Sequence, residues 1–219
     1  MKNLSFPDAF VFDWDNTLVQ SWDIILEALN HTFYSFSLPL WTMTDVKNNV
    51  RASLRDSFPQ IFGNEWLKAQ EIFYNYILTH HLDRLSPEEG AEQLLDFLLK
   101  KGVYLAIVSN KKGDILRKEV QKIGWLKYFN KVIGAGDASS DKPSIEPVTL
   151  ALADLIQASH KSIWFVGDTD IDMLCAKNSN CVPVLVRKEA PQENEFNQIE
   201  PVYYFPDCIN LMSTLSSIK

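Results

Sequence analysis

Hydrophobic residues in this 219-residue chain follow two patterns, one of short strands and one of helices. The run Ala9 to Phe12 is wholly apolar and has the length of a strand buried on both faces. Further runs of strand length are at 103–108, 131–134, 162–166, 182–186 and 202–205. Helical patterns separate them, so the sequence predicts an α/β fold, a Rossmann-like parallel sheet with helices on both faces.

The block directly behind the first strand is helical and contains no predicted strand. Its apolar residues recur at helical spacing over 22–33, 44–56 and 64–81. Pro39 separates the first two of these predicted helices, and Pro59 with Gly63 separates the last two. We therefore expect a helical cap, residues 19–84, inserted into an α/β core made of residues 1–18 and 85–219.

The alternation resumes at Ser86, where several helix-start signals coincide. Ser86 can cap a helix, Pro87 suits its first position, and Glu89 completes a capping box. This helix is expected to end at Gly102. Later helices are predicted over 113–123 and 145–157, in a short stretch ending near 178, and from 207 onward.

The composition of the chain limits the classes of partner that the protein is expected to bind. The formal net charge of −7 argues against nucleic acid or an anionic membrane surface as the main partner. We find neither a signal peptide nor an apolar run near the roughly 18 residues of a membrane span, so a cytoplasmic protein is expected. The odd number of cysteines, three, predicts reduced thiols. His80 and His81 end a predicted helix, where a cation suits the dipole.

Asp13 and Asp15 follow the first strand with one residue between them. If the extended geometry persists, both carboxylates point the same way, and their repulsion calls for a cation or a shared proton. Other strand ends also carry polar residues. These are Ser109, Asn110, Lys142, Asp168 and Asp172.

The carboxyl ends of parallel strands meet at one edge of the sheet, where α/β proteins bind ligands. Carboxylate oxygens suit a hard divalent cation such as Mg²⁺, and Lys142 would neutralise phosphate oxygens away from the metal. Taken singly, each position has an ordinary explanation: an acidic turn, a polar turn, a surface lysine or a helix start. Their joint occurrence at successive strand ends favours a reactive site.

These residues resemble the motifs of the haloacid-dehalogenase-like (HAD) phosphohydrolase superfamily. Asp13-Trp14-Asp15-Asn16-Thr17 matches DxDxT, Ser109 follows a strand, Lys142 precedes a proline, and Gly167-Asp168 through Asp172 matches GDxxxD. The helical block falls where phosphoglycolate-phosphatase-like members insert a small cap. Asn16 stands where a glycine is usual, which bears on the subgroup rather than on the chemistry.

The resemblance implies roles for the first motif and its partners. Asp13 would be the nucleophile that forms an aspartyl-phosphate, and Asp15 would protonate the leaving oxygen and then activate water. Thr17 would orient Asp13 or bond the phosphoryl group. The phosphoryl oxygens would be bound by Ser109, Lys142 and the backbone amide of Asn110.

The resemblance also implies a metal site. Mg²⁺ would be held by Asp13, by the backbone carbonyl of Asp15 and by Asp168. Asp172 would be a further ligand or would support the others. The second aspartate, Asp15, favours phosphate esters over carbon–halogen bonds, because a leaving halide needs no acid.

The expected function is Mg²⁺-dependent hydrolysis of a small phosphorylated metabolite, of the phosphoglycolate or sugar-phosphate type. A phosphomutase of the same superfamily and a non-catalytic binding or regulatory protein are the alternatives. Lys47, Arg51 and Arg55 share one face of a predicted cap helix. Either Arg51 or Arg55 could reach a negative group of the substrate, or the three could form a solvated basic stripe. The sequence leaves open whether the protein is a monomer or a homodimer.

Overall fold

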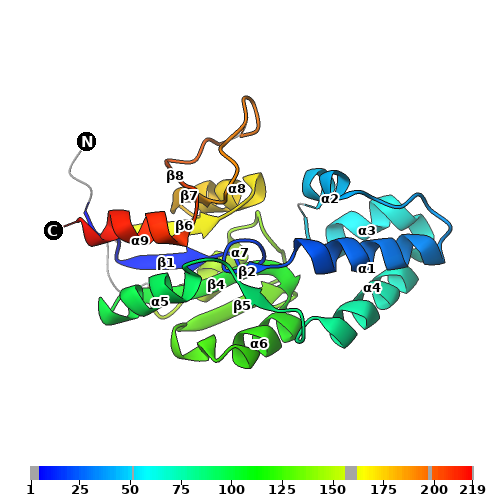
Figure 1. The fold of residues 1–219 in the computed structure, drawn as a ribbon, viewed down its shortest axis with the longest axis horizontal. Coiled ribbons are helices and arrows are strands. Elements are labelled where there is room, and N and C mark those ends of the chain that lie inside the picture. Colours follow the sequence, from blue (N-terminus) through cyan, green and yellow to red (C-terminus); the bar gives the residue numbers. More distant parts are fainter. Residues whose placement is uncertain (1–4, 51, 156–161, 197–198, 219) are drawn as a thin grey trace.

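The computed structural model describes residues 5–50, 52–155, 162–196 and 199–218. A sheet with helices on both faces forms one end of the molecule, and a bundle of helices forms the other end (Figure 1). No helix in these ranges is long and apolar enough to cross a membrane.

The sheet confirms the predicted α/β architecture. Its strands are β1 (Ala9–Phe12), β4 (Tyr104–Lys112), β5 (Lys131–Ala135), β6 (Ile163–Gly167), β7 (Val182–Val186) and β8 (Tyr203–Phe205). They lie in the order β5-β4-β1-β6-β7-β8, and all neighbours are parallel. The chain runs from β1 outward to β5 and returns to the other side of β1. The carboxyl end of β1 is therefore the point where ligands bind in such sheets.

The alternation of side chains along β1 divides the core into two layers. Phe10 and Phe12 belong to a cluster with α5 (Ala91–Lys100), α6 (Gly113–Lys122) and α9 (Cys208–Ser216). Val11 belongs to a second cluster on the opposite face, with α7 (Glu146–Ala151) and α8 (Asp170–Asn178). Burial on both faces explains why the first strand reads as a continuous apolar run.

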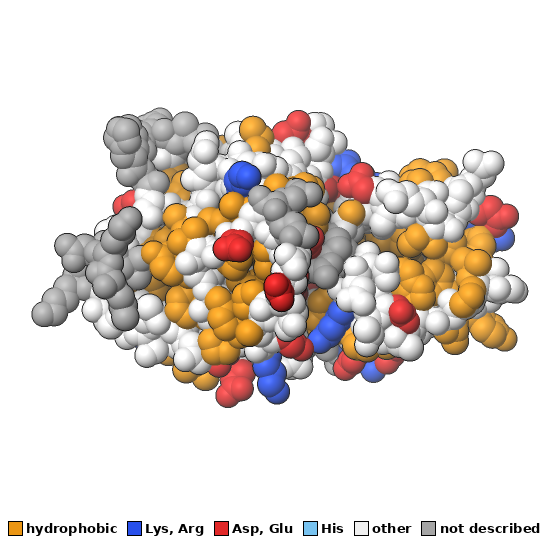
Figure 2. Space-filling model, turned by 90° about the horizontal axis from the view of Figure 1, so that it is seen from above, with side chains coloured by type: hydrophobic (Ala, Val, Ile, Leu, Met, Phe, Trp, Pro, Cys, Tyr) orange, Lys and Arg blue, Asp and Glu red, His pale blue; other side chains and the backbone are white. Residues whose placement is uncertain are grey.

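The bundle contains α1 (Trp22–Ser35), α2 (Met43–Asn49), α3 (Leu54–Phe62), a short η1 (Gly63–Glu65) and α4 (Trp66–His80). We call these helices the cap. They enclose a separate aromatic core that includes Phe33, Phe58 and Phe73. Two short strands, β2 (Val19–Gln20) and β3 (Ser86–Pro87), pair antiparallel where the chain enters and leaves the cap. The face seen in Figure 2 exposes apolar side chains on both the core and the cap.

Several predicted boundaries were wrong. The helix expected over 44–56 is two helices, because Val50 and Ser53 adopt extended conformations between α2 and α3. Pro59 lies inside α3 and does not interrupt it. The segment from Ser86 forms β3, and α5 begins only at Ala91. The helix expected over 145–157 ends at Ala151, and residues 156 and 157 lie outside the described residues.

Candidate active site

Asp13 follows β1 directly, and its amide donates to the carbonyl of Val166 in β6, which extends the sheet by one residue. Its carboxylate is buried beside the equally buried Lys142. Lys142 Nζ lies 2.8 Å from Asp13 Oδ1 and 2.7 Å from Asp172 Oδ1. The two carboxylates outweigh burial and raise the pKa of Lys142, so the ammonium stays charged.

Asp172 is fixed by the first turn of α8. Its Oδ2 accepts from the Thr169 hydroxyl at 2.7 Å and from the amides of Thr169 and Asp168 at 3.0 and 3.2 Å. This is a capping box, with Thr169 as the cap residue. Gly167 makes the arrangement possible, because a Cβ there would lie 2.3 Å from the Cβ of Asp172. The GDxxxD spacing is thus explained by packing as well as by chemistry.

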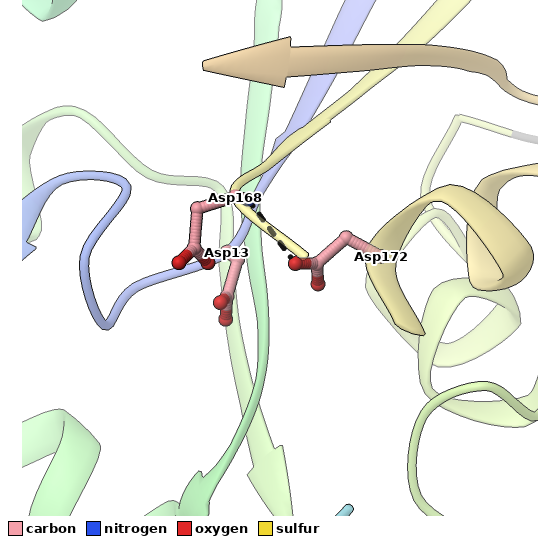
Figure 3. A group of neighbouring side chains, drawn as sticks. All are labelled: Asp13, Asp168 and Asp172. Carbon is pink, nitrogen blue, oxygen red and sulfur yellow. Dashed lines mark hydrogen bonds between the residues drawn. The ribbon is translucent and has the colours of Figure 1, made fainter. Parts of the chain in front are cut away.

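Three carboxylates meet at the ends of β1 and β6 and at the start of α8 (Figure 3). Asp13, Asp168 and Asp172 each offer an oxygen within 4.8 Å of the others, and all three are buried. Burial raises the pKa of Asp13 to about 6, with the charges of Asp172 and Asp15 adding to the effect. Burial, together with the charges of Asp172 and Asp13, raises the pKa of Asp168 well above its usual range.

One ammonium therefore faces three carboxylates that would repel one another when ionised. An oxygen-rich, buried set of this kind fits a hard divalent cation, whose charge would keep the carboxylates ionised. The side chain of Asp15 is not part of the group. Of the residues predicted to bind metal, the structure brings together the carboxylates of Asp13, Asp168 and Asp172.

Ser109 and Asn110 lie within β4, close to its end. Ser109 is buried, and its hydroxyl accepts from the amide of Lys111 at 3.3 Å. The Asn110 side chain forms two bonds to the backbone of Lys142: Oδ1 accepts from its amide at 2.9 Å, and Nδ2 donates to its carbonyl at 3.2 Å. The side chain of Asn110 thus positions the loop that carries Lys142.

The loop after β1 carries two further features. Thr17 is buried, and its Oγ1 has no hydrogen-bond partner among the residues that the structure describes. A bound ligand would satisfy such a group. Asn16 has φ of 59°, a left-handed conformation that glycine and asparagine tolerate best. Asparagine in place of the usual glycine at this position therefore keeps the same backbone conformation.

A second buried network extends from Asp15, and sequence reasoning missed it. Lys111 Nζ lies 2.6 Å from Asp15 Oδ1 and 2.7 Å from Glu119 Oε2. Glu119 also accepts from Trp14 Nε1 at 2.6 Å and lies 2.8 Å from His81 Nδ1. A signal existed in the sequence, since Glu119 lies on the face of α6 that carries the buried Ile115, Leu116 and Val120.

The histidine pair lies at the end of a helix, as predicted, and His81 makes an additional contact. The helix α4 ends at His80, but His81 is buried at its C-cap and contacts Glu119. Its ring thus contacts a carboxylate of the core, which the sequence does not predict. The three cysteines are free and buried, as the predicted reduced state requires.

A cavity of about 150 Å³ lies between the core and the cap. Asp13, Ser109 and Lys142 line its core side. The described cap residues that line it include no Asp, Glu, Lys or Arg. They are Trp22, Ile24, Ile25, Leu29, Trp41, Asn49, Val50, Ala52, Leu54, Ser57, Phe58, Ile61, Phe73, Tyr74, Ile77 and His81.

Of the two arginines proposed to reach the substrate, Arg55 lies among the described residues and Arg51 does not. Arg55 lies on α3, and its Nε is 2.6 Å from Oδ2 of Asp141, the residue before Lys142. Arg55 is not among the described residues that line the cavity. Arg51 lies outside the described residues, between Val50 and Ala52, which both line the cavity.

Comparisons with known proteins agree with this geometry. A sequence model of the haloacid dehalogenase-like hydrolases matches residues 10–186. The pyrophosphatase PpaX of Halalkalibacterium halodurans is 25% identical over 208 residues, which cover 94% of this chain and 96% of the relative.

Solved structures share the fold. A HAD-superfamily hydrolase from Ehrlichia chaffeensis superposes with a TM-score of 0.68 at 25% identity and covers 98% of both chains. A predicted phosphoglycolate phosphatase from Haemophilus somnus superposes with a TM-score of 0.81 at 20% identity, over 96% of this chain and 99% of that one.

Proposed function

Because the chain belongs to the haloacid dehalogenase-like hydrolases, we propose that it is a Mg²⁺-dependent phosphatase acting on a small phosphorylated metabolite. One observation carries the proposal: Lys142 lies between Asp13 and Asp172, beside a buried group of three carboxylates. A phosphoryl group placed against Asp13 would have two cationic partners, the ammonium of Lys142 and a Mg²⁺ ion held by the carboxylates. Phosphoryl transfer is catalysed mainly by such positioning and charge.

The proposed reaction uses the two aspartates of the loop after β1. An oxygen of Asp13 attacks phosphorus, the ester P–O bond breaks, and Asp15 gives a proton to the departing oxygen. Water then attacks the aspartyl-phosphate, Asp15 takes its proton, and phosphate leaves. Ser109, Thr17, Lys142 and the backbone amide of Asn110 would bind the phosphoryl oxygens during both steps.

Asp13, Asp168 and the backbone carbonyl of Asp15 would hold Mg²⁺, and Asp172 would bind it or support its ligands. The ion would neutralise phosphoryl charge and keep Asp13 ionised. The raised pKa of Asp13, about 6, supports this assignment, because a cation bound beside the carboxylate would lower that pKa and favour the ionised, nucleophilic form.

The proposal is tested by hydrolysis of p-nitrophenyl phosphate with and without Mg²⁺. We expect chelation to abolish the activity and added Mg²⁺ to restore it. Asp13→Asn should reduce kcat by at least about a thousandfold, since it removes the attacking oxygen. Equal rates for the variant and the parent would refute the nucleophile assignment.

The same assay separates the alternatives. A phosphomutase would return the phosphoryl group to a bisphosphate, so release of phosphate without isomerised product excludes it. A non-catalytic protein on this fold would release no phosphate from any member of a metabolite panel.

The cavity bears on the leaving group. An anionic leaving group, such as that of phosphoglycolate or pyrophosphate, needs a cation on the cap side, and either Arg51 or Arg55 would supply it. The cap residues described along the cavity include no Asp, Glu, Lys or Arg and are mostly apolar, and the lysines that line it, Lys111, Lys112 and Lys142, lie on its core side. We therefore favour a compact leaving group with apolar surface. A volume of about 150 Å³ also favours small esters over nucleotides.

A further inference from the structure

The network between Asp15 and α6 has a geometry that bears on proton transfer. Lys111 bridges two carboxylates, Asp15 on one side and Glu119 on the other, at 2.6 and 2.7 Å. It contacts only one oxygen of Asp15, Oδ1. No residue in the described part of the chain bonds to the other oxygen, Oδ2, which can therefore meet the leaving group or water.

Glu119 is itself held from three directions. Its Oε2 accepts from Trp14 Nε1 and from Lys111, and its Oε1 contacts His81 Nδ1. These partners come from the loop after β1, from the end of β4 and from the end of the cap. A carboxylate that is only 1% exposed and bonded at both oxygens cannot rotate without breaking several bonds.

The charges of the network are also matched. Burial works against the charge of Lys111, but Asp15 and Glu119 more than compensate and raise its pKa. Burial likewise opposes ionisation of Glu119, yet Lys111 and the hydrogen bond from His81 lower its pKa. Glu119 thereby offsets the Lys111 charge, and the ammonium can act on Asp15 mainly through a directed hydrogen bond.

We propose that Lys111 and Glu119 are positioning residues, which hold the carboxyl group of Asp15 in the orientation for proton transfer to the leaving oxygen. The proposal rests on the proposed phosphatase function. It predicts that their loss harms the protonation of the leaving group more than it harms phosphoryl binding. A purely structural role would lower all rates together.

The test compares kcat/KM for phenyl phosphate and p-nitrophenyl phosphate, which have similar size but unequal leaving groups. Nitrophenolate departs without a proton, whereas phenolate benefits from one. Glu119→Gln and Lys111→Met should each lose at least about tenfold on phenyl phosphate and less than about threefold on p-nitrophenyl phosphate. Asp15→Asn serves as the reference for complete loss of the proton donor.

Lys118→Met is the matched control, because Lys118 precedes Glu119 on α6 but is exposed. It should change neither rate by more than about twofold. If the other variants do not fold, Lys111→Arg provides a further test, because it keeps a cation between the two carboxylates. It should still shift the ratio of kcat/KM for the two substrates by about threefold or more. An equal loss on both substrates, in whichever of these variants folds, overturns the proposal. If the parent protein hydrolyses neither substrate, the phosphatase function fails instead.

Discussion

At the scale of single residues, packing explains why the GDxxxD motif begins with glycine, Gly167. Its missing side chain leaves room for Asp172, whose Cγ would lie 2.4 Å from a Cβ at this position. Gly167→Ala should displace Asp172 from Lys142 and from its cap, and so reduce kcat by at least about tenfold. We expect a loss in unfolding free energy of about 1–3 kcal/mol, measured by denaturant titration.

Gly102→Ala provides the matched control for this prediction. Gly102 has φ of 68° and no atom within 4 Å of a built Cβ, so alanine there causes backbone strain without a clash. It should cost about 1 kcal/mol of stability and leave kcat unchanged. A Gly167→Ala variant with parental kcat would show that Asp172 does not need its present position.

Asn16 is a second residue whose identity follows from the backbone. Its φ is 59°, and its Oδ1 accepts from the amide of Ser21 at 3.0 Å. Asn16→Gly should cost only about 0.5–1.5 kcal/mol, because it keeps the conformation and loses one hydrogen bond. Asn16→Val should cost about 1–3 kcal/mol more, because a branched side chain is strained there. Thermal unfolding of both variants checks this order, and equal stabilities would contradict it.

At the scale of elements, two of the ion pairs between described cap and core residues differ in burial. Arg55 on α3 meets Asp141, whose side chain is 2% exposed, whereas Lys47 on α2 meets Glu189, whose side chain is 61% exposed. A double-mutant cycle with Arg55→Ala and Asp141→Asn should give a coupling of about 1–3 kcal/mol. The same cycle with Lys47→Ala and Glu189→Gln should give less than about 1 kcal/mol.

The first pair should also affect catalysis, because Asp141 precedes Lys142 and also accepts from the amide of Gly136. We expect Arg55→Ala to raise KM for p-nitrophenyl phosphate by about threefold or more, and Lys47→Ala to leave it unchanged. Equal couplings in the two cycles, or unchanged KM in both variants, would contradict a special role for Arg55.

The sequence predicts best the elements whose burial alone determines their pattern of hydrophobic residues. The strand Ala9–Phe12 was predicted to the residue, because both of its faces are covered. Ser86 and Pro87 misled because their helix signals are local, whereas the chain there pairs with β2 on its return from the cap. The break near Val50 was missed because nothing in the local pattern distinguishes two short helices from one longer helix.

The site residues likewise fall into two classes, those that the local sequence predicts and those that only the fold brings together. Asp13, Asp168 and Asp172 follow from strand ends and motif spacing, and the structure groups their carboxylates. Lys111 and Glu119 were not predicted, since their partners lie far away in sequence and only the fold brings them together. A charged residue on an otherwise buried helix face, as Glu119 is, was the one local indication.

At the scale of the whole molecule, we expect catalysis and selectivity to come from different parts of the chain. The core supplies the reactive groups, and the cap supplies the opposite wall of the cavity. The cap also has its own aromatic core, to which α6 contributes Ile115. We therefore expect substitutions along the cap side of the cavity to change the choice of substrate without disturbing the carboxylates of the core.

The apolar cap wall of the cavity should favour an apolar leaving group over an anionic one. Isobutyl phosphate should be hydrolysed with a kcat/KM at least about tenfold above those of phosphoglycolate and pyrophosphate. The apolar wall gains about 0.8 kcal/mol for each buried methylene, and its described residues offer no lysine or arginine to a second anion. Leu54→Lys introduces a cation at a lining position and should narrow this ratio by about tenfold. Leu67→Lys, at a cap residue that is 61% exposed and not among the described lining residues, should not change it.

The same panel decides the role of Arg51. If phosphoglycolate or pyrophosphate is preferred by the parent and the preference disappears in Arg51→Ala, this arginine supplies the missing cation and the apolar leaving group is excluded. If isobutyl phosphate is preferred and Arg51→Ala leaves the ratio unchanged, the described wall is sufficient to explain selectivity. Either outcome keeps the chemistry at Asp13 intact, because hydrolysis of p-nitrophenyl phosphate monitors that chemistry separately.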